Sequence, residues 1–289
     1  MNSLKTVALL GLMSGVLLFG GEMIGGRQGL EMGLLLAAGM NFFGYFFSEK
    51  IALMSNGAQP VTPEERPDVY ARLAPIVRRL TQKMGLPMPK LWVIPEESPN
   101  AFATGRNPEH ASVACTEGIL QLMTDRELEG VLAHELGHVL HRDILISSVA
   151  ATLASAITFL ARMAFWFGPR GDDDDERGNP WAGLLMMILA PFAAMLIQMA
   201  ISRTREFDAD AASAKYTGNP DGLIHALQKL EMGVERVPMP DASPATAHMF
   251  ILNPFGGAGG MSRLFSTHPS TEERIARLEA LRGSRAYVS

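Results

Sequence analysis

The sequence contains 289 residues, of which 47% are hydrophobic and 19% are charged. Soluble domains usually carry about 25% charged residues, so this low share and the mean hydropathy of +0.12 point to a membrane. The composition excludes a disordered chain and a fibrous repeat. The single cysteine, Cys115, excludes a disulfide scaffold. The net charge of −5 argues against a nucleic-acid partner.

Four long stretches of the sequence carry no charged residue: Thr6–Gly21, Met32–Ser48, Ile144–Ala161 and Trp181–Ser202. A helix that crosses a bilayer needs roughly 17–25 mostly apolar residues. The last two stretches satisfy this requirement, and the first two do so if the charged residues at their ends lie at the membrane interface. We therefore expect four spans, arranged as two helical hairpins.

Two other interpretations of these stretches stay open. Lys5 and the apolar run behind it also fit a cleaved signal peptide, but an A-x-A cleavage site is missing and a second apolar stretch follows Arg27. An uncleaved hairpin is therefore favoured. The last two stretches also fit a buried hairpin in a soluble core, but Trp181–Ser202 is long for a core helix.

Lysine and arginine residues near the ends of the stretches predict the side of the membrane on which each segment lies. Their bias places both termini and the segment 49–143 in the cytoplasm. We expect a transmembrane hairpin at 1–48, the first part of a cytoplasmic domain at 49–143, a second hairpin at 144–202 and the rest of the domain at 203–289. The acidic loop 168–180 would lie on the outer side.

The soluble parts predict a mainly α-helical α+β domain with a small sheet. Strands are expected at Lys90–Pro95, Asn100–Thr104 and Ala111–Thr116, the last two joined by the turn Gly105–His110. Helices are expected at Glu64–Met84 with a kink at Pro75, from Asp125 onward behind a capping box of Thr124 and Glu127, at Pro220–Met232, and at Thr271–Arg282 behind Ser270 and Glu273. Gly233–Gly260 is expected to be a mobile loop.

The strongest functional signal is the run HELGH at residues 134–138, which matches the H-E-x-x-H pattern. On the helix expected from Asp125, His134 and His138 share one face, so both imidazoles can hold one zinc ion. Glu135 then points beside the metal and can take a proton from a zinc-bound water. A solvated helix with two unrelated histidines is the weaker alternative.

A catalytic zinc ion needs a third protein ligand and an open position. Glu206 is the favoured ligand, because two predicted spans separate it from His138 and so return it to the same membrane edge. Asp210 shares its helix face and can accept the free N–H of a zinc-bound histidine. Two other candidate ligands are less favoured. His141 lies on the same straight helix as the two histidines, and three ligands on one straight face cannot surround an ion. Cys115 is expected to be a packed core residue. The alternative to a metal ligand at Glu206 is a helix at the membrane edge whose arginine and glutamate side chains only pair with each other.

Several segments, spread over nearly the whole chain, match one known family. They are Met40–Phe43, Ser98–His110, Leu128–His138, Arg142–Leu145, Arg205–Asp210, Ser266–Ser270 and Glu273–Ile275. The chain resembles the HtpX-type zinc metalloproteases, which are bacterial inner-membrane relatives of the CAAX prenyl proteases. The metal motif alone is shared by many zinc proteases, but its combination with the glutamate-containing segment and four spans is specific. Pro75 departs from the pattern, away from the site.

The resemblance implies an endopeptidase that degrades damaged or misfolded membrane proteins on the cytoplasmic side of the bacterial inner membrane. It also implies a role in a stress response, alongside other membrane quality-control proteases. One zinc ion per chain would be bound by His134, His138 and Glu206, with Glu135 as the general base and Asp210 supporting a histidine ligand.

Two further roles come with the resemblance. An edge strand containing Asn100, Ala101, Phe102 and Ala103 would bind an extended substrate by strand addition, with an ordinary strand as the alternative. His268 would donate to the oxyanion or fill the open metal position, with a structural histidine before the last helix as the alternative. The other residues considered, His110, His225, His248 and Asp208, are expected to be solvated.

Three other functions fit parts of the sequence. A CAAX-type protease acting on lipidated peptides would need more spans. A non-catalytic, zinc-stabilised scaffold or chaperone would need a closed and usually cysteine-rich site, whereas two histidines and a carboxylate leave a position open. A zinc transporter would carry its ligands inside the spans. A membrane zinc endopeptidase acting on polypeptides is therefore favoured, with the bilayer as a partner and no nucleic acid.

Overall fold

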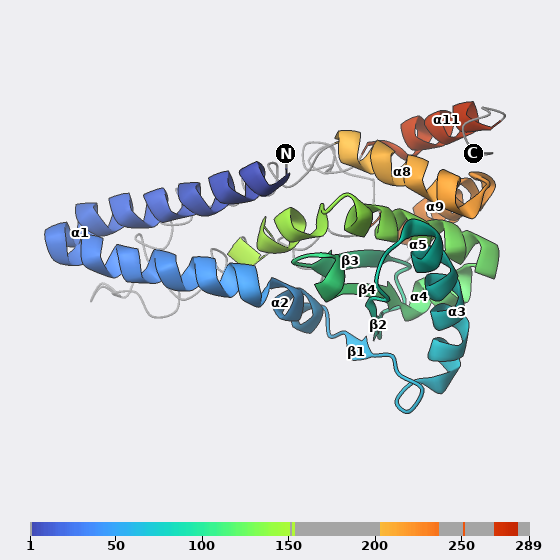
Figure 1. Ribbon diagram of the computed structural model, residues 1–289, viewed down its shortest axis with the longest axis horizontal. Coiled ribbons are helices and arrows are strands. Elements are labelled where there is room, and N and C mark those ends of the chain that lie inside the picture. The colour runs from blue at the N-terminus through green and yellow to red at the C-terminus, as the bar shows by residue number, and fades with distance from the viewer. Residues whose placement is uncertain (1, 151, 154–202, 237–250, 252–268, 283–289) are drawn as a thin grey trace, which may run out of the picture.

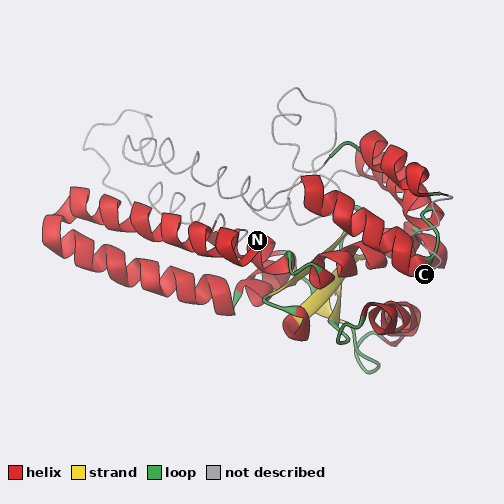
Figure 2. Cartoon of the chain, turned by 45° about the horizontal axis from the view of Figure 1, so that its top comes forward, coloured by secondary structure: helices red, strands yellow, loops and turns green. Residues whose placement is uncertain are grey.

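A computed structural model of the protein describes residues 2–150, 152–153, 203–236, 251 and 269–282. Its elements are α1 (Asn2–Phe46), α2 (Ser48–Ser55), β1 (Gln59–Pro60), α3 (Pro67–Met84), β2 (Lys90–Ile94), β3 (Ala101–Gly105), the short 3₁₀ helix η1 (Pro108–His110), β4 (Ala111–Thr116), α4 (Glu117–Leu122), α5 (Asp125–Leu140), α8 (Arg203–Thr217), α9 (Asp221–Arg236) and α11 (Thr271–Leu281). The chain is mainly helical with one small sheet, as predicted (Figure 2). The predicted fourth span and the loop 168–180 lie outside the described residues.

The two N-terminal apolar stretches form a helical hairpin that projects from one end of the molecule (Figure 1). α1 reverses direction at Gly26, whose backbone angles (φ 55°, ψ −135°) favour glycine. The two arms pack closely, because a Cβ at Gly33 would lie 2.5 Å from the carbonyl oxygen of Leu17. Asn41 also donates a hydrogen bond to Ser14 Oγ at 2.9 Å. The expected hairpin is therefore present.

The start of the third predicted span packs against this hairpin. Residues 144–150 are helical. The buried cluster that joins the two parts consists of Leu9, Met13, Ile146, Val149, Ala150 and Leu153. Elsewhere on the hairpin, large apolar side chains are exposed, such as Leu35 at 67% and Phe43 at 55%. Burial within the protein therefore accounts for only part of the apolar surface of the hairpin.

Length and hydropathy identify one candidate membrane element in the described part of the chain. No single helix there is both long and apolar enough to cross a bilayer. The helices Gly26–Phe46 and Ser48–Ser55 meet the requirement together, although they are bent by 75° where they join. The second predicted stretch, Met32–Ser48, overlaps the first helix of this bent pair and runs past the bend to the first residue of the second helix.

The sheet has the strand order β1-β2-β4-β3, with β2 and β4 parallel and the other pairs antiparallel. β3 therefore lies at one edge of the sheet, as the predicted substrate strand requires. Its side chains alternate between two cores. Ala101 and Ala103 belong to the main core with α5, whereas Phe102 packs with Leu53 of α2 on the other side.

α5 is the central helix, against which α3, α8, α9 and β3 pack (Figure 1). Its start is fixed by the predicted capping box. The Oγ1 atom of Thr124 accepts a hydrogen bond from the N–H of Glu127, and the Glu127 carboxylate accepts one from the N–H of Thr124. Leu128, Leu132 and Leu136 are fully buried on this helix. The rigid α5 therefore carries the H-E-x-x-H run through the core.

Several predicted boundaries differ from the structure. The helix expected from Glu64 begins at Pro67, because proline suits the first helical position, and it continues as one helix through Pro75. α9 extends to Arg236, so the first residues of the expected loop Gly233–Gly260 are helical, and nearly all of its remainder lies outside the described residues. The short elements α2, β1 and α4 were not predicted, because such short segments show no clear periodicity.

Gly137 sets the distance between α5 and α8. A Cβ at this position would lie 3.1 Å from Cα of Ala209 and 3.2 Å from Cβ of Ala212. We predict that Gly137→Val forces the helices apart and lowers the free energy of unfolding by about 1–3 kcal/mol. Denaturant unfolding in detergent measures this change. Ala211→Val, at an exposed position of α8, is the control, and equal stability of the two variants would contradict the prediction.

Cys115 is a packed core residue of β4, as expected, with no exposed surface. Burial raises the pKa of its thiol to about 12, and the charge of Glu135 adds to this effect. We therefore predict that Cys115 stays unreactive toward a thiol reagent at mildly alkaline pH in the folded protein. One thiol per chain should react after denaturation. Rapid labelling of the native protein would place Cys115 outside the core.

Candidate metal centre

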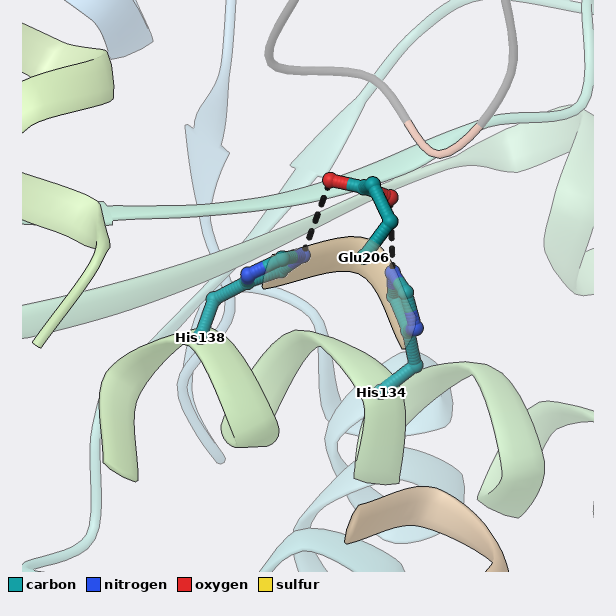
Figure 3. Close-up of side chains that lie close together, drawn as sticks. All are labelled: His134, His138 and Glu206. Carbon is teal, nitrogen blue, oxygen red and sulfur yellow. Dashed lines mark ion pairs between the residues drawn. The ribbon is translucent and has the colours of Figure 1, made fainter. Parts of the chain in front are cut away.

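The three side chains predicted to bind zinc, His134 and His138 of α5 and Glu206 of α8, lie close together (Figure 3). Nε2 of His134 lies 3.7 Å from Oε2 of Glu206, and Nε2 of His138 lies 3.6 Å from Oε1 of the same carboxylate. One ligand atom from each residue lies within 4.8 Å of the others. The two imidazole rings stand at 87° to each other. α8 thus returns Glu206 to the histidines of α5, as the topology of the sequence predicts.

The spacing of these atoms suits one zinc-sized ion. Two atoms bound to a tetrahedral zinc ion at about 2.0–2.2 Å stand roughly 3.4 Å apart. The two His–Glu206 distances, 3.7 and 3.6 Å, end on different oxygens of the carboxylate, and one ligand atom from each residue lies within 4.8 Å of the others. Side-chain rotations would therefore have to draw the three ligand atoms closer around one ion. Two imidazole nitrogens and one carboxylate are a donor set of catalytic zinc sites with an open position. Magnesium and calcium prefer oxygen donors throughout.

Asp210 and Arg274 orient His134, which is 1% exposed. Nδ1 of His134 lies 2.8 Å from Oδ1 of Asp210, so this nitrogen donates its proton to Asp210 and Nε2 faces Glu206. Arg274 binds both oxygens of Asp210. Burial tends to raise the pKa of Asp210, but Arg274 and His134 together lower it. Burial also lowers the pKa of His134 to about 4, with a contribution from Arg274.

Asp143 orients His138 in the same way, with its Oδ2 atom 3.4 Å from Nδ1 of the imidazole. α5 ends at Leu140, and Arg142, two residues later, adopts a left-handed conformation (φ 58°). The N–H of Asp143 then donates to the carbonyl of His138 at 2.8 Å. Burial lowers the pKa of His138, but Asp143 and the neighbouring glutamates outweigh this effect and raise it to about 9.

Glu135 is a residue of α5, and its side chain faces the edge strand β3. It is 2% exposed, and its carboxylate accepts a hydrogen bond from the backbone N–H of Ala103. Burial raises its pKa to about 8, against the opposing charge of His138 and with a contribution from Glu206. A buried carboxyl group with a pKa near neutrality is suited to proton transfer.

The open edge of β3 faces this site through its backbone. The carbonyl of Asn100 accepts a hydrogen bond from Thr116 at the end of β4. Because successive residues of a strand direct their backbone groups to opposite sides, Ala101 and Ala103 present theirs to the open edge. The carbonyl of Ala101 accepts a hydrogen bond from the N–H of Ile251 at 3.2 Å. Of these outward groups, the carbonyl of Ala101 thus contacts Ile251 and the N–H of Ala103 contacts Glu135.

The remaining predicted residues divide into two sets. His110, His225 and Asp208 are exposed, as expected, and His141 is exposed at the end of α5. His248 and His268 lie outside the described residues, so the expected role of His268 stays a prediction. The sequence argument missed the contacts of Asp143 and Arg274. Both lie in segments that carried the family resemblance, which was the available signal.

Comparison with known proteins extends these observations. The model of "Peptidase family M48" matches residues 67–282. A protein named "Protease HtpX homolog" from Desulfatibacillum aliphaticivorans is 55% identical, and the alignment covers 97% of this chain and 90% of the relative. Proteins of the same name from Syntrophotalea carbinolica and Thermodesulfovibrio yellowstonii are 52% and 54% identical and are covered over 98% and 99% of their lengths.

Among solved structures, the chain is similar to S. mikatae Ste24p, with 20% identity and a TM-score of 0.47. That alignment covers 96% of this chain and 64% of the longer protein. The assignment rests instead on the family model and on relatives that are named proteases and align over nearly their whole length. The buried residues His134 and Glu135 and the partly buried His138 lie within the matched range. The chain therefore belongs to peptidase family M48.

Proposed function

We propose that this protease is a zinc endopeptidase of the bacterial inner membrane that cleaves polypeptides held as an extended strand beside β3. The observation that carries this proposal is the meeting of His134, His138 and Glu206 around a common point, with the buried carboxylate of Glu135 next to them. The hydrogen bond from Ala103 to Glu135 supports it further, because it brings the edge strand to the same point.

The roles of the side chains follow from their contacts. When bound, zinc would polarise the scissile carbonyl and lower the pKa of the attacking water to about 7. Glu135 would take a proton from that water and pass it to the leaving amine. Asp210 and Asp143 would hold the two histidines in the orientation that directs Nε2 inward. We retain His268 as a candidate donor to the oxyanion.

The membrane part of the proposal is supported by the hairpin and by the distribution of charge. Exposed apolar side chains such as Leu35 and Phe43 are suited to lipid contact. The lysine and arginine bias places 49–143 and 203–289 in the cytoplasm, with 1–48 and 144–202 in the membrane. Damaged or misfolded membrane proteins would be natural substrates, because their unfolded segments emerge beside such a site.

We predict that Glu135→Gln retains bound zinc and loses cleavage by a factor of about 10²–10⁴, since it removes the proton acceptor alone. The measurement is casein cleavage by the full chain in detergent, with metal content determined for each sample. Glu206→Gln should lose metal as well as cleavage. Glu129→Gln, which changes another glutamate of α5 that pairs with Arg79, should match the wild type. Full cleavage by Glu135→Gln would disprove the assigned role.

Removal of metal supplies the matching test. A chelator should abolish cleavage by the wild type, and stoichiometric zinc should restore it. Bound zinc without cleavage of several unfolded substrates would favour the scaffold or chaperone alternative. Cleavage restricted to lipidated peptides would favour the CAAX-type alternative.

The edge strand makes a separate prediction about substrates. A peptide added beside β3 would donate and accept hydrogen bonds at every second residue. We therefore predict that N-methylation of a cleavable peptide raises KM at alternate positions, by a factor of about 5–10 for each lost hydrogen bond. Methylation at the intervening positions, whose N–H groups point away from β3, should leave KM nearly unchanged. A uniform response along the peptide would contradict strand addition.

A further inference from the structure

Arg274 is a fully buried charged residue next to the metal centre, although it comes from α11, far from the motif in sequence. We propose that Arg274 is a positioning residue, which fixes Asp210 and thereby aims His134 at the metal. This inference rests on the metal centre proposed above. It assigns a role to a residue outside the candidate ligand set of the ion.

The guanidinium group of Arg274 uses all three of its nitrogens. Nη2 donates to Oδ1 of Asp210 at 2.7 Å, and Nε donates to Oδ2 at 2.9 Å. Nη1 donates to the backbone carbonyl of Ile251 at 3.1 Å. The paired contacts hold both oxygens of the carboxylate, and the third contact prevents rotation of the guanidinium group. The plane of the Asp210 carboxylate is therefore fixed.

The orientation of Asp210 determines that of His134. Its Oδ1 atom, which Arg274 holds, is the same atom that faces Nδ1 of His134 at 2.8 Å. Nη2 of Arg274 itself lies 3.3 Å from Nδ1, but the contact of Nδ1 with Asp210 is shorter, at 2.8 Å. A carboxylate that rotated away would therefore release the imidazole ring from its shortest contact. Nε2, on the opposite side of the ring, would then lose its alignment with Glu206.

Arginine suits this task better than another cation would. Asp210 is 2% exposed, and a buried carboxylate without a counter-charge is strongly destabilising. A lysine would compensate the charge, but a single ammonium group lacks the planar fork that holds two oxygens at once. The geometry therefore requires an arginine rather than only a positive charge at position 274.

The test compares the full-length wild type with Arg274→Lys, Arg274→Met, the double variant Arg274→Met/Asp210→Asn and the control Arg277→Met. Arg277 lies on the same helix, but it is half-exposed and contacts Glu273 and Phe207. Three quantities are measured at one pH. They are the zinc dissociation constant by chelator competition, the visible spectrum of the cobalt-substituted protein, and kcat and KM for a peptide.

For Arg274→Lys we expect a zinc dissociation constant about 10–100-fold above that of the wild type, a changed cobalt spectrum, and a lower kcat with little change in KM. Arg277→Met should match the wild type in all three. Arg274→Met leaves the buried Asp210 without its counter-charge and so risks unfolding. The double variant removes that charge, and we expect it to fold while binding zinc more weakly than the wild type.

Wild-type zinc affinity and an unchanged cobalt spectrum in Arg274→Lys and in the folded double variant would overturn the positioning role. If the proposed zinc site itself is wrong, the result is distinguishable, because the wild type would then bind no zinc. A loss of affinity that Arg277→Met shares would reduce the effect to general damage of α11, and would also overturn the inference.

Discussion

The close contact between α5 and α8 is the constraint on which the candidate site depends. Gly137 lies between the two histidines in sequence, and its missing side chain lets Ala209 of α8 approach the backbone of α5. Further along the same helix pair, Ser213 donates a hydrogen bond to the carbonyl of Gly130 at 2.7 Å. Because α5 and α8 lie this close together, the single carboxylate of Glu206 reaches both histidines. A larger residue at position 137 would push α8 away from α5 and move Glu206 away from the two histidines.

Around this contact, the charged side chains form two similar series of ion pairs. Each begins at a histidine, continues to an aspartate and ends at an arginine: His134–Asp210–Arg274 and His138–Asp143–Arg205. The first is tight and buried, whereas the second is longer, with 3.9 Å between the arginine and the aspartate. Because buried carboxylates need compensation, each arginine lets an acidic group act on a histidine inside the core. Burial lowers the pKa of both histidines; Arg274 adds to this effect at His134, whereas Asp143, Glu206 and Glu135 outweigh it at His138.

Local patterns explain which parts were predictable from the sequence. The helix period places His134 and His138 on one face, and a capping box marks the start of α5. Asp210 could be placed because it follows Glu206 by one turn. Arg274 could not, because 64 residues separate it from Asp210 and no periodicity connects them. Asp143 depends on a left-handed residue other than glycine, which sequence preferences do not indicate.

The outward backbone groups of β3 have a further consequence. A free sheet edge is a template for unwanted pairing between molecules. Here the carbonyl of Ala101 meets Ile251, and the N–H of Ala103 meets Glu135. The edge is therefore already satisfied at these two points, which protects the resting protein from edge-to-edge aggregation. A peptide that pairs with β3 would first have to displace these two contacts, so Ile251 and Glu135 would have to change partners when a substrate binds.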